Sequence, residues 1–526
     1  MAYDSLLVQR RRELHALVGN AIEELYADRL PEHYEMLAHH FSKAEDWPRA
    51  LNYLLKAAEK ATQAFGLRQA LDHYGEALVA AGRMGDRVPA ATVIAIHGAR
   101  ADLYFGLGEF VRSREEGERL ADLARRIQDR PAEAGALMQI ASALQWIEDF
   151  PTAHERVREA IEIAEEVGAQ GPLGGGLYIR GYMNAVNGRL DVAETDLGRA
   201  LEIGRATGDV NRQALVLHLL ALKRSWVGQY RESLALGEEG IRFAREHRMA
   251  IPLLRCLWNR ALACHEMGDH DRAVAALDEG LALAEKLGDD AYVPRYLNTL
   301  GFVRIDCGDF AAGIALSERS YEVTAVSSRA GHGTGAERRA FIRNNEGDAF
   351  MARGDLSSAA QALDESLHIV QHPPPSRWMT WRYTTHCYAS LGQLALLRGD
   401  ADGARRFAEQ GLESATAPPS RKYQSWAWRL KGESATARHA WGEAEDALRR
   451  ALALALEIGH PRLTWQSHAA LARLHAACGR AEEARAADRA ALTTISDLRA
   501  RTRDPGLLAG LASLAAIREI EDRARR

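Results

Sequence analysis

The feature that most constrains the fold of this 526-residue chain is a residue pattern that returns about every 40 residues. Glycine occupies most of the turn positions, and a small residue stands five and usually again twelve positions after each turn. Glycine adopts a left-handed backbone without strain, so these positions predict helix ends. The small residues predict a second helix that crosses the first closely. The turn positions are Gly108, Glu148, Gly188, Gly228, Gly268, Gly308, Gly354, Gly399, His439 and Gly479.

Several turns continue with an aspartate, as at Asp269, Asp309, Asp355 and Asp400. An aspartate at this position can accept a hydrogen bond from the first backbone N–H groups of the next helix, which predicts a helix start there. A pair of helices built in this way has one apolar face that only the next pair can cover. The pattern therefore predicts an array of helix pairs, which can grow to this length without a central core.

The order small–x6–Gly–x–aromatic–x2–Ala–x6–Ala resembles the tetratricopeptide repeat, here with units of 40 residues instead of about 34. The resemblance implies an all-α, right-handed α-solenoid of antiparallel helix pairs, whose first helices line a concave inner surface. We expect about ten pairs over residues 86–503 and a capping helix over 504–526. Residues 326–340 predict a loop insertion between two pairs.

Residues 1–85 predict a helical junction with one divergent repeat, in which the helix 66–84 has no evident partner. This stretch resembles the junction that follows the ATPase module in ATPase-linked class III adenylate cyclases and in signal-transduction ATPases with numerous domains. The chain has no GxxxxGK[ST] motif, so the resemblance implies the repeat half of such a bacterial regulator. The alternative is the regulatory part of an enzyme whose catalytic domains lie outside this chain.

Composition and charge argue against several other classes of protein. With 67 basic and 72 acidic residues the chain has no excess of positive charge for general nucleic-acid binding. Five cysteines without a CxxC pair predict neither a disulfide framework nor a zinc site. No signal-peptide pattern or membrane-length apolar run is present, which predicts a cytoplasmic protein without membrane association.

No residue cluster in the sequence predicts catalysis, a cofactor or a metal ion. The adjacent His39 and His40 point in different directions on a helix, as two ligands of one metal would not. The sequence GHGTG at 331–335 lacks the lysine and the preceding strand of a phosphate-binding loop. His265 and His270, with the aspartates at 269 and 271, are interpreted as a solvated helix junction. We therefore expect a chain that is not an enzyme.

The strongest binding signal is a group of aromatic and basic residues on first helices late in the chain. Rigid aromatic rings next to arginine are typical of binding hot spots. The other interpretation is that the rings only fill gaps between long helices. The candidate partner-binding residues of this group are Arg377, Trp378, Trp381, Arg382, Trp426, Trp428 and Trp465.

A weaker signal is the recurrence of arginine and asparagine on earlier first helices, from which Arg295, Asn298 and Asn344 are further candidates. Such a series could hold a peptide carboxylate or backbone, whereas hydrogen bonds between helices are the alternative. Taken together, the sequence predicts a non-enzymatic interaction scaffold. Its partner would be a peptide, a protein domain or a second copy of the chain, bound at the concave surface.

Overall fold

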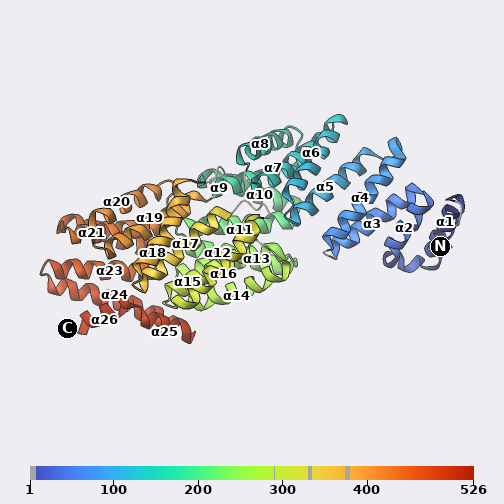
Figure 1. Cartoon of the computed structure of the whole chain (residues 1–526). Helices are drawn as coiled ribbons and strands as arrows, with labels where there is room; N and C mark the ends of the chain where they lie inside the picture. The colour runs from blue at the N-terminus through green and yellow to red at the C-terminus, as the bar shows by residue number, and fades with distance from the viewer. Residues whose placement is uncertain are drawn as a thin grey trace. The chain divides into compact units, whose positions relative to one another are not determined.

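The computed structural model of the chain describes residues 8–64, 66–147, 149–289, 291–329, 335–373 and 379–525, and these form helices and turns without a strand. Contacts divide the chain into two compact units, Met1–Ile179 and Arg180–Arg526. Figure 1 shows that successive helices run antiparallel within each unit. The predicted all-α solenoid is therefore confirmed.

In the first unit each α-helix from α1 to α7 packs on the next one in the chain. The pair α3 and α4 is in close contact, so the helix that seemed unpaired in the sequence has a partner. The helices are α1 (Val8–Leu25), η1 (Ala27–His33), α2 (Tyr34–Ala44), α3 (Trp47–Gln63), α4 (Leu67–Met84), η2 (Gly85–Arg87), α5 (Ala90–Gly106), α6 (Phe110–Arg126), α7 (Arg130–Trp146), α8 (Phe150–Glu166) and the start of α9 (Gln170–Val186).

The second unit continues the same scheme up to the C-terminus. Its helices are α10 (Leu190–Thr207), α11 (Val210–Trp226), α12 (Tyr230–Glu246), α13 (Ala250–Glu266), α14 (His270–Leu287), α15 (Val293–Asp306), α16 (Phe310–Arg329), α17 (Gly335–Ala352), α18 (Leu356–Gln371), α19 (Thr380–Leu397), α20 (Ala401–Ser414), α21 (Arg421–Ala437), α22 (Trp441–Glu457), α23 (Pro461–Ala477), α24 (Ala481–Arg501), α25 (Pro505–Ser513) and α26 (Ala515–Arg525).

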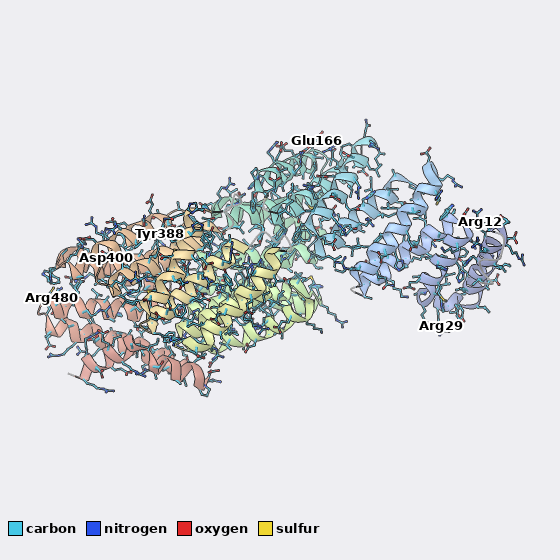
Figure 2. The ribbon with its side chains drawn as sticks, in the orientation of Figure 1. Arg12, Arg29, Glu166, Tyr388, Asp400 and Arg480 are labelled. Carbon is cyan, nitrogen blue, oxygen red and sulfur yellow. The ribbon has the colours of Figure 1, made fainter. Side chains whose placement is uncertain are left out.

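First helices form the inner layer of the second unit. Each contacts the first helix of the next pair, as α11 does with α13, α17 with α19, and α19 with α21. The second helices lie outside them, and Figure 2 labels Asp400 and Arg480, the residues that precede the second helices α20 and α24. Side chains from successive first helices therefore face a common inner side.

The turn chemistry predicted from the sequence is confirmed where the structure describes it. The turn glycines have positive φ angles, from 73° at Gly108 to 90° at Gly228, and His439 adopts the same conformation with φ 60°. The aspartate caps also form: Asp400 accepts a hydrogen bond from the N–H of Gly403 at 2.7 Å. The small residues after the turns, such as Ala193 and Ala273, are fully buried at the helix crossings. Glu148 lies outside the described residues.

Two expectations about the second half need correction. Residues 326–329 and 335–340 are helical, as the end of α16 and the start of α17, and 330–334 lie outside the described residues. The predicted capping helix over 504–526 is two helices, because Leu514 takes an extended conformation with ψ 118° between α25 and α26. Asp504 caps α25 by accepting a hydrogen bond from Leu507 N at 2.9 Å. Ile517 and Ile520 of α26 are buried, as expected of a cap.

Candidate functional site

Two parts of the second unit rest on each other, although they are far apart in the sequence. We call residues 180–309 the first arm and residues 379–511 the second arm. Three turn glycines of the first arm touch the second arm in a fixed register, because the partner advances by 40 residues whenever the turn does. A Cβ added to these glycines would lie 3.0 Å from Pro418 at Gly188, 2.8 Å from Ile458 at Gly228 and 2.5 Å from Leu498 at Gly268.

The contact between the arms continues on the inner side through two matched columns of side chains. Residues at the ends of α11, α13 and α15 face residues at the starts of α19, α21 and α23. The three facing pairs are Trp226 with Arg382, Glu266 with Lys422, and Asp306 with Arg462. The second arm thus offers a cation in every pair, whereas the first arm offers a carboxylate in only two of them.

The Glu266–Lys422 pair is a buried ion pair with a third member. Lys422 Nζ donates to Glu266 Oε1 at 2.7 Å, and His460 Nε2 lies 2.7 Å from Glu266 Oε2. Burial by itself would raise the pKa of Glu266, but Lys422 and His460 outweigh it and hold this pKa well below its usual range. Both partners of the carboxylate come from the second arm, so the ion pair fastens the two arms together.

The Asp306–Arg462 pair repeats this arrangement one unit further on. Asp306 also accepts a hydrogen bond from His265 Nε2 at 3.0 Å, and His265 Nδ1 lies 3.2 Å from His270 Nδ1. A small cavity of about 20 Å³, enough for one water molecule, lies among these side chains. Both histidines are buried under the second arm, so the solvated junction expected from the sequence is wrong.

Arg382 differs from Lys422 and Arg462 because Trp226 stands where the other two cations meet a carboxylate. Its guanidinium carbon lies 5.2 Å from the ring centroids of both Trp226 and Phe341. None of its five N–H donors has a hydrogen-bond or ion-pair partner among the described residues. Burial lowers the pKa of Arg382, and Tyr423, followed by Glu337 and Glu266, only partly offsets this effect. Arg382 is thus a half-buried cation without a counter-ion.

The two rings beside Arg382 are themselves held in place. Trp226 packs edge-on against Trp381, with centroids 5.6 Å apart, and Trp381 Nε1 donates to the carbonyl oxygen of Val186 at 3.2 Å. Phe341 packs edge-on against the buried Tyr383 at 6.2 Å. The rings come from α11 and α17, so the site is formed by both arms and by the helix pair between them.

The groups around the guanidinium are polar and largely enclosed. Tyr423 is buried, and burial raises its pKa while Lys422 and Arg382 oppose the rise. Burial likewise raises the pKa of Tyr230 well above its usual value, and Arg382 again acts against this shift. Tyr230 also lines a cleft of about 940 Å³ that opens between the arms. Arg382 thus lies among buried side chains, next to an open cleft, and has no ion-pair partner among the described residues.

The structure brings two of the predicted residues, Trp381 and Arg382, directly into this site. Trp426 lies close by on α21, where its ring stacks on Tyr423 with centroids 6.3 Å apart, and its Nε1 is buried without a partner among the described residues. Arg377 and Trp378 lie outside the described residues.

The remaining tryptophans lie away from Arg382. Trp428 is on another face of α21, where Arg450 of the outer helix α22 lies 4.8 Å from its ring. Trp465 is buried in the core that joins α23 to α24 and α26. These two placements correspond to the gap-filling interpretation of the tryptophans.

The three candidates on earlier helices have partners within the chain. Arg295 pairs with Glu337 at 3.1 Å, and its guanidinium lies 5.7 Å from the ring of Trp258. Asn298 accepts a hydrogen bond from Asn345 at 2.9 Å. Asn344 is fully buried and donates to the carbonyl oxygen of Tyr383 at 3.2 Å. All three join consecutive first helices along the inner layer.

Sequence reasoning missed Trp226, Glu266 and Phe341. A signal for the first two exists, since the position two residues before the turn reads tryptophan, glutamate and aspartate in three consecutive repeats. The position at the start of later first helices reads arginine, lysine and arginine at the same spacing. Nothing in the sequence says, however, that these two columns face each other.

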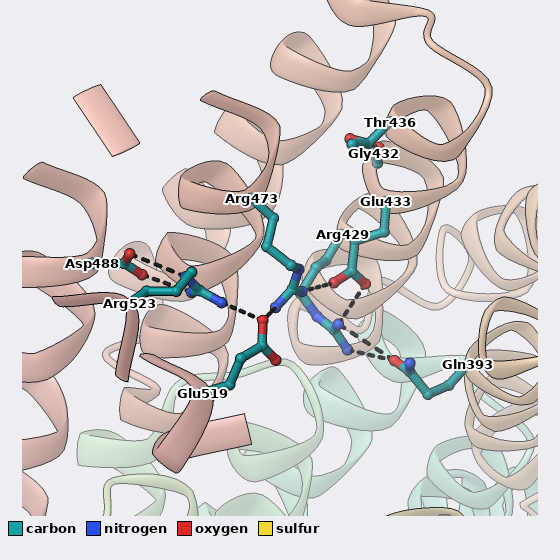
Figure 3. A network of polar contacts seen from close by, with 9 residues as sticks. All are labelled: Gln393, Arg429, Gly432, Glu433, Thr436, Arg473, Asp488, Glu519 and Arg523. Carbon is teal, nitrogen blue, oxygen red and sulfur yellow. Dashed lines mark hydrogen bonds and ion pairs between the residues drawn. The ribbon is translucent and has the colours of Figure 1, made fainter. Parts of the chain in front are cut away.

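A second polar network links the inner layer to the C-terminal cap (Figure 3). Glu433 accepts hydrogen bonds from Arg429 at 2.7 Å and from Arg473, and Arg429 also donates to Gln393. At the other end, Arg523 of α26 pairs with Asp488 at 2.7 Å and with Glu519. Each arginine of this network has a carboxylate partner within the chain. Arg382 differs in this respect, because it has no such partner among the described residues.

Comparison with known proteins agrees with the repeat architecture. A family model described as tetratricopeptide repeat matches residues 254–287, which form most of α13 and all of α14. No curated protein matches the sequence. The matched stretch is one helix pair of the second unit.

Similar solved structures include the APC/C hetero-tetramer Cut9-Hcn1, with a TM-score of 0.47, 14% identity and coverage of 100% of this chain and 95% of that chain. The apo form of the quorum sensor NprR from B. thuringiensis has a TM-score of 0.44 and 13% identity, with coverage of 71% of this chain and 99% of that chain. A signal-transduction ATPase with a tetratricopeptide repeat sensor from Pyrococcus horikoshii has a TM-score of 0.43 and 15% identity, with coverage of 70% of this chain and 52% of that chain. These likenesses concern the helical repeat fold.

Among the described residues, no helix is long and apolar enough to cross a membrane. Within the same residues, no group of three or more histidine, cysteine, aspartate or glutamate side chains could hold a metal ion. The thiols of Cys256 and Cys387 are buried, and burial raises the pKa of each to about 12. They therefore stay protonated and unreactive at neutral pH.

Proposed function

We propose that this chain is an interaction scaffold that binds a peptide carboxylate at Arg382, between the two arms of the second unit. The observation that carries this proposal is the broken pairing of the two columns. Glu266 and Asp306 supply a carboxylate to Lys422 and Arg462, and Trp226 supplies none to Arg382. A carboxylate from a partner would complete the third pair.

The chemistry around Arg382 favours a singly charged planar anion. A guanidinium has donors in a fixed fork that matches a carboxylate, and the bond is strong where water is excluded. A phosphate group would bring a charge of about −1.5 to −2 into a site already influenced by Glu337 and Glu266. The negative charges of these two residues oppose a dianion more than a monoanion.

The wider role that we propose is the sensory or regulatory repeat region of a bacterial signalling protein. Support comes from the resemblance of residues 1–85 to the junction of ATPase-linked regulators, in which catalytic domains lie elsewhere. The resemblance to class III adenylate cyclases stays a prediction. In either setting the chain would act without catalytic chemistry of its own, by binding a partner and changing how the two arms are held.

The experiment is a peptide array in which each sequence appears with a free and with an amidated C-terminus, and with or without acidic side chains. We expect the full chain to retain peptides that carry a carboxylate and to lose them with Arg382→Gln. Arg450→Gln is the matched control, because Arg450 also lies over an aromatic ring, Trp428 at 4.8 Å, but at an exposed position on the outer helix α22.

The control variant should bind the same peptides as the wild-type chain. Arg382→Lys keeps the charge without the planar fork, so we expect it to bind about tenfold more weakly than wild type. Equal retention of free and amidated peptides, or unchanged binding by Arg382→Gln, would show that Arg382 is not the site.

A further inference from the structure

The outward face of α1 carries a stripe of apolar side chains. Leu14, Leu17, Val18, Ala21 and Leu25 recur at helical spacing, and the four larger ones are between 37% and 77% exposed. Side chains at these positions lie on one side of a helix, one turn after another. They form a patch on the order of 400 Å², a size that marks interaction sites on soluble proteins.

The stripe is held outward by the packing of the opposite side of α1. Ile22 is buried there, and Gly19 lies so close to Phe41 of α2 that an added Cβ would be 2.8 Å from its ring. Turning the helix to hide the stripe would separate these residues. The exposed stripe is therefore fixed by the fold.

Val79, Val192 and Leu456 are also exposed apolar residues, but each stands apart from the others in the sequence. An isolated exposed apolar residue is normal on a protein surface. Five exposed apolar residues in succession along three turns of α1 are unusual on a protein surface, and they indicate contact with a partner surface.

The charges at the two ends of α1 identify that partner. Arg10, which also pairs with Glu13 of the same helix at 2.9 Å, and Arg11 stand at the start of the stripe. The exposed Glu24 stands near its end, and the exposed Asp28 follows in η1. A second α1 that runs antiparallel to the first would place the basic end of each copy next to the acidic end of the other, on both sides of a twofold axis. A parallel pair would bring like charges together.

We infer that α1 is a self-association surface, at which two copies of the chain pack their apolar stripes antiparallel. The area buried would be on the order of 800 Å² in total, below the roughly 1,200–2,000 Å² of stable specific interfaces. The dimer is therefore weak, and the fraction of chains in the dimer rises with protein concentration. Its formation does not depend on Arg382.

The first test is sedimentation velocity of the full chain over a concentration series. We expect a reversible monomer–dimer equilibrium that Leu17→Glu weakens by at least about tenfold, because it would bury an unpaired charge in each copy. Leu456→Glu is the matched control, since Leu456 is 58% exposed and Leu17 is 59% exposed. It should leave the equilibrium unchanged. Circular dichroism confirms that both variants fold.

The second test uses charge reversal at the two ends. One variant carries Arg10→Glu with Arg11→Glu, and the other carries Glu24→Lys with Asp28→Lys. Each alone should lose dimerisation, because both contacts become repulsive. A mixture of the two should form a heterodimer, because both contacts become attractive again.

Three results would overturn the inference. A chain that stays monomeric at every concentration has no such interface, and its stripe then belongs to a different partner. An equal effect of Leu17→Glu and Leu456→Glu would place the contact elsewhere. A mixture of the two charge variants that stays monomeric would exclude the antiparallel arrangement.

Discussion

The ion pair between Glu266 and Lys422 gives the sharpest prediction about how the two arms are held. Replacing Lys422 by methionine keeps most of the side-chain volume and removes the charge that faces Glu266. The carboxylate stays buried, with His460 as its remaining partner. Removing one member of a buried pair costs about 3–5 kcal/mol, because an uncompensated charge is left away from water.

The assay is hydrogen exchange of the amides at the end of α13 and the start of α21, together with urea unfolding of the full chain. A cost of this size increases the fraction of molecules with separated arms by two to more than three orders of magnitude. The amides near Glu266 and Lys422 should therefore exchange faster by a similar factor. Adding Glu266→Gln to Lys422→Met should restore part of the loss, because the buried charge is then gone.

The matched control is Arg449→Met. Arg449 forms a pair of nearly the same length with Glu445, at 2.6 Å against 2.7 Å, but is mostly exposed to solvent. Exposed pairs contribute less than about 1 kcal/mol, so this variant should behave almost as wild type. If Lys422→Met is no more harmful than Arg449→Met, the arms are not held by buried charge and the reasoning fails.

Three further predictions follow from the same contacts. Without ligand, Arg382→Met should raise the free energy of unfolding in urea by about 1 kcal/mol, because it removes a half-buried charge that has no partner among the described residues. A loss of stability as large as that of Lys422→Met would mean that Arg382 has an acceptor within the chain. Burial, followed by His265, lowers the pKa of His270 to about 3. Below pH ~6.5 this histidine binds a proton in the unfolded chain but not in the folded chain, so the free energy of unfolding should fall by ~2 kcal/mol between pH 7 and pH 5. A urea midpoint that is independent of pH in this range would contradict the burial of His270. Gly308→Ala should release α25, because the new Cβ would lie 2.4 Å from the carbonyl oxygen of Gly510. The release would be measured as faster hydrogen exchange over 503–511. Gly354→Ala is the control, since Gly354 has nearly the same φ and nothing within 4 Å, and it should leave the exchange of these amides unchanged.

Much of the architecture could be predicted from the sequence because it rests on local interactions. A glycine ends a helix where it stands, as Gly268 does with φ 79°. An aspartate caps the helix that follows it, and a buried alanine marks the crossing of two neighbouring helices. Each of these depends on residues within one repeat or the next, so the 40-residue spacing reports them directly.

The candidate site was predicted only in part. Trp381 and Arg382 were identified because aromatic and basic residues stand out on a first helix. The same signal also selected Trp465, which is buried in the C-terminal core, and Trp428, which packs toward the outer helix α22. Composition does not distinguish the faces of a helix, and the partner across the inner side decides which side chain is free.

The sequence by itself determined the helix pairs, their turns and the small residues at their crossings. Only the tertiary structure decided that Trp226 faces Arg382, that Glu266 faces Lys422, and that Arg382 is left without a counter-ion. The physical reason is that the meeting of the arms depends on small rotations between successive pairs, summed over several repeats. The longer repeats that end at Gly354 and Gly399 enter this sum, and no local pattern records the total.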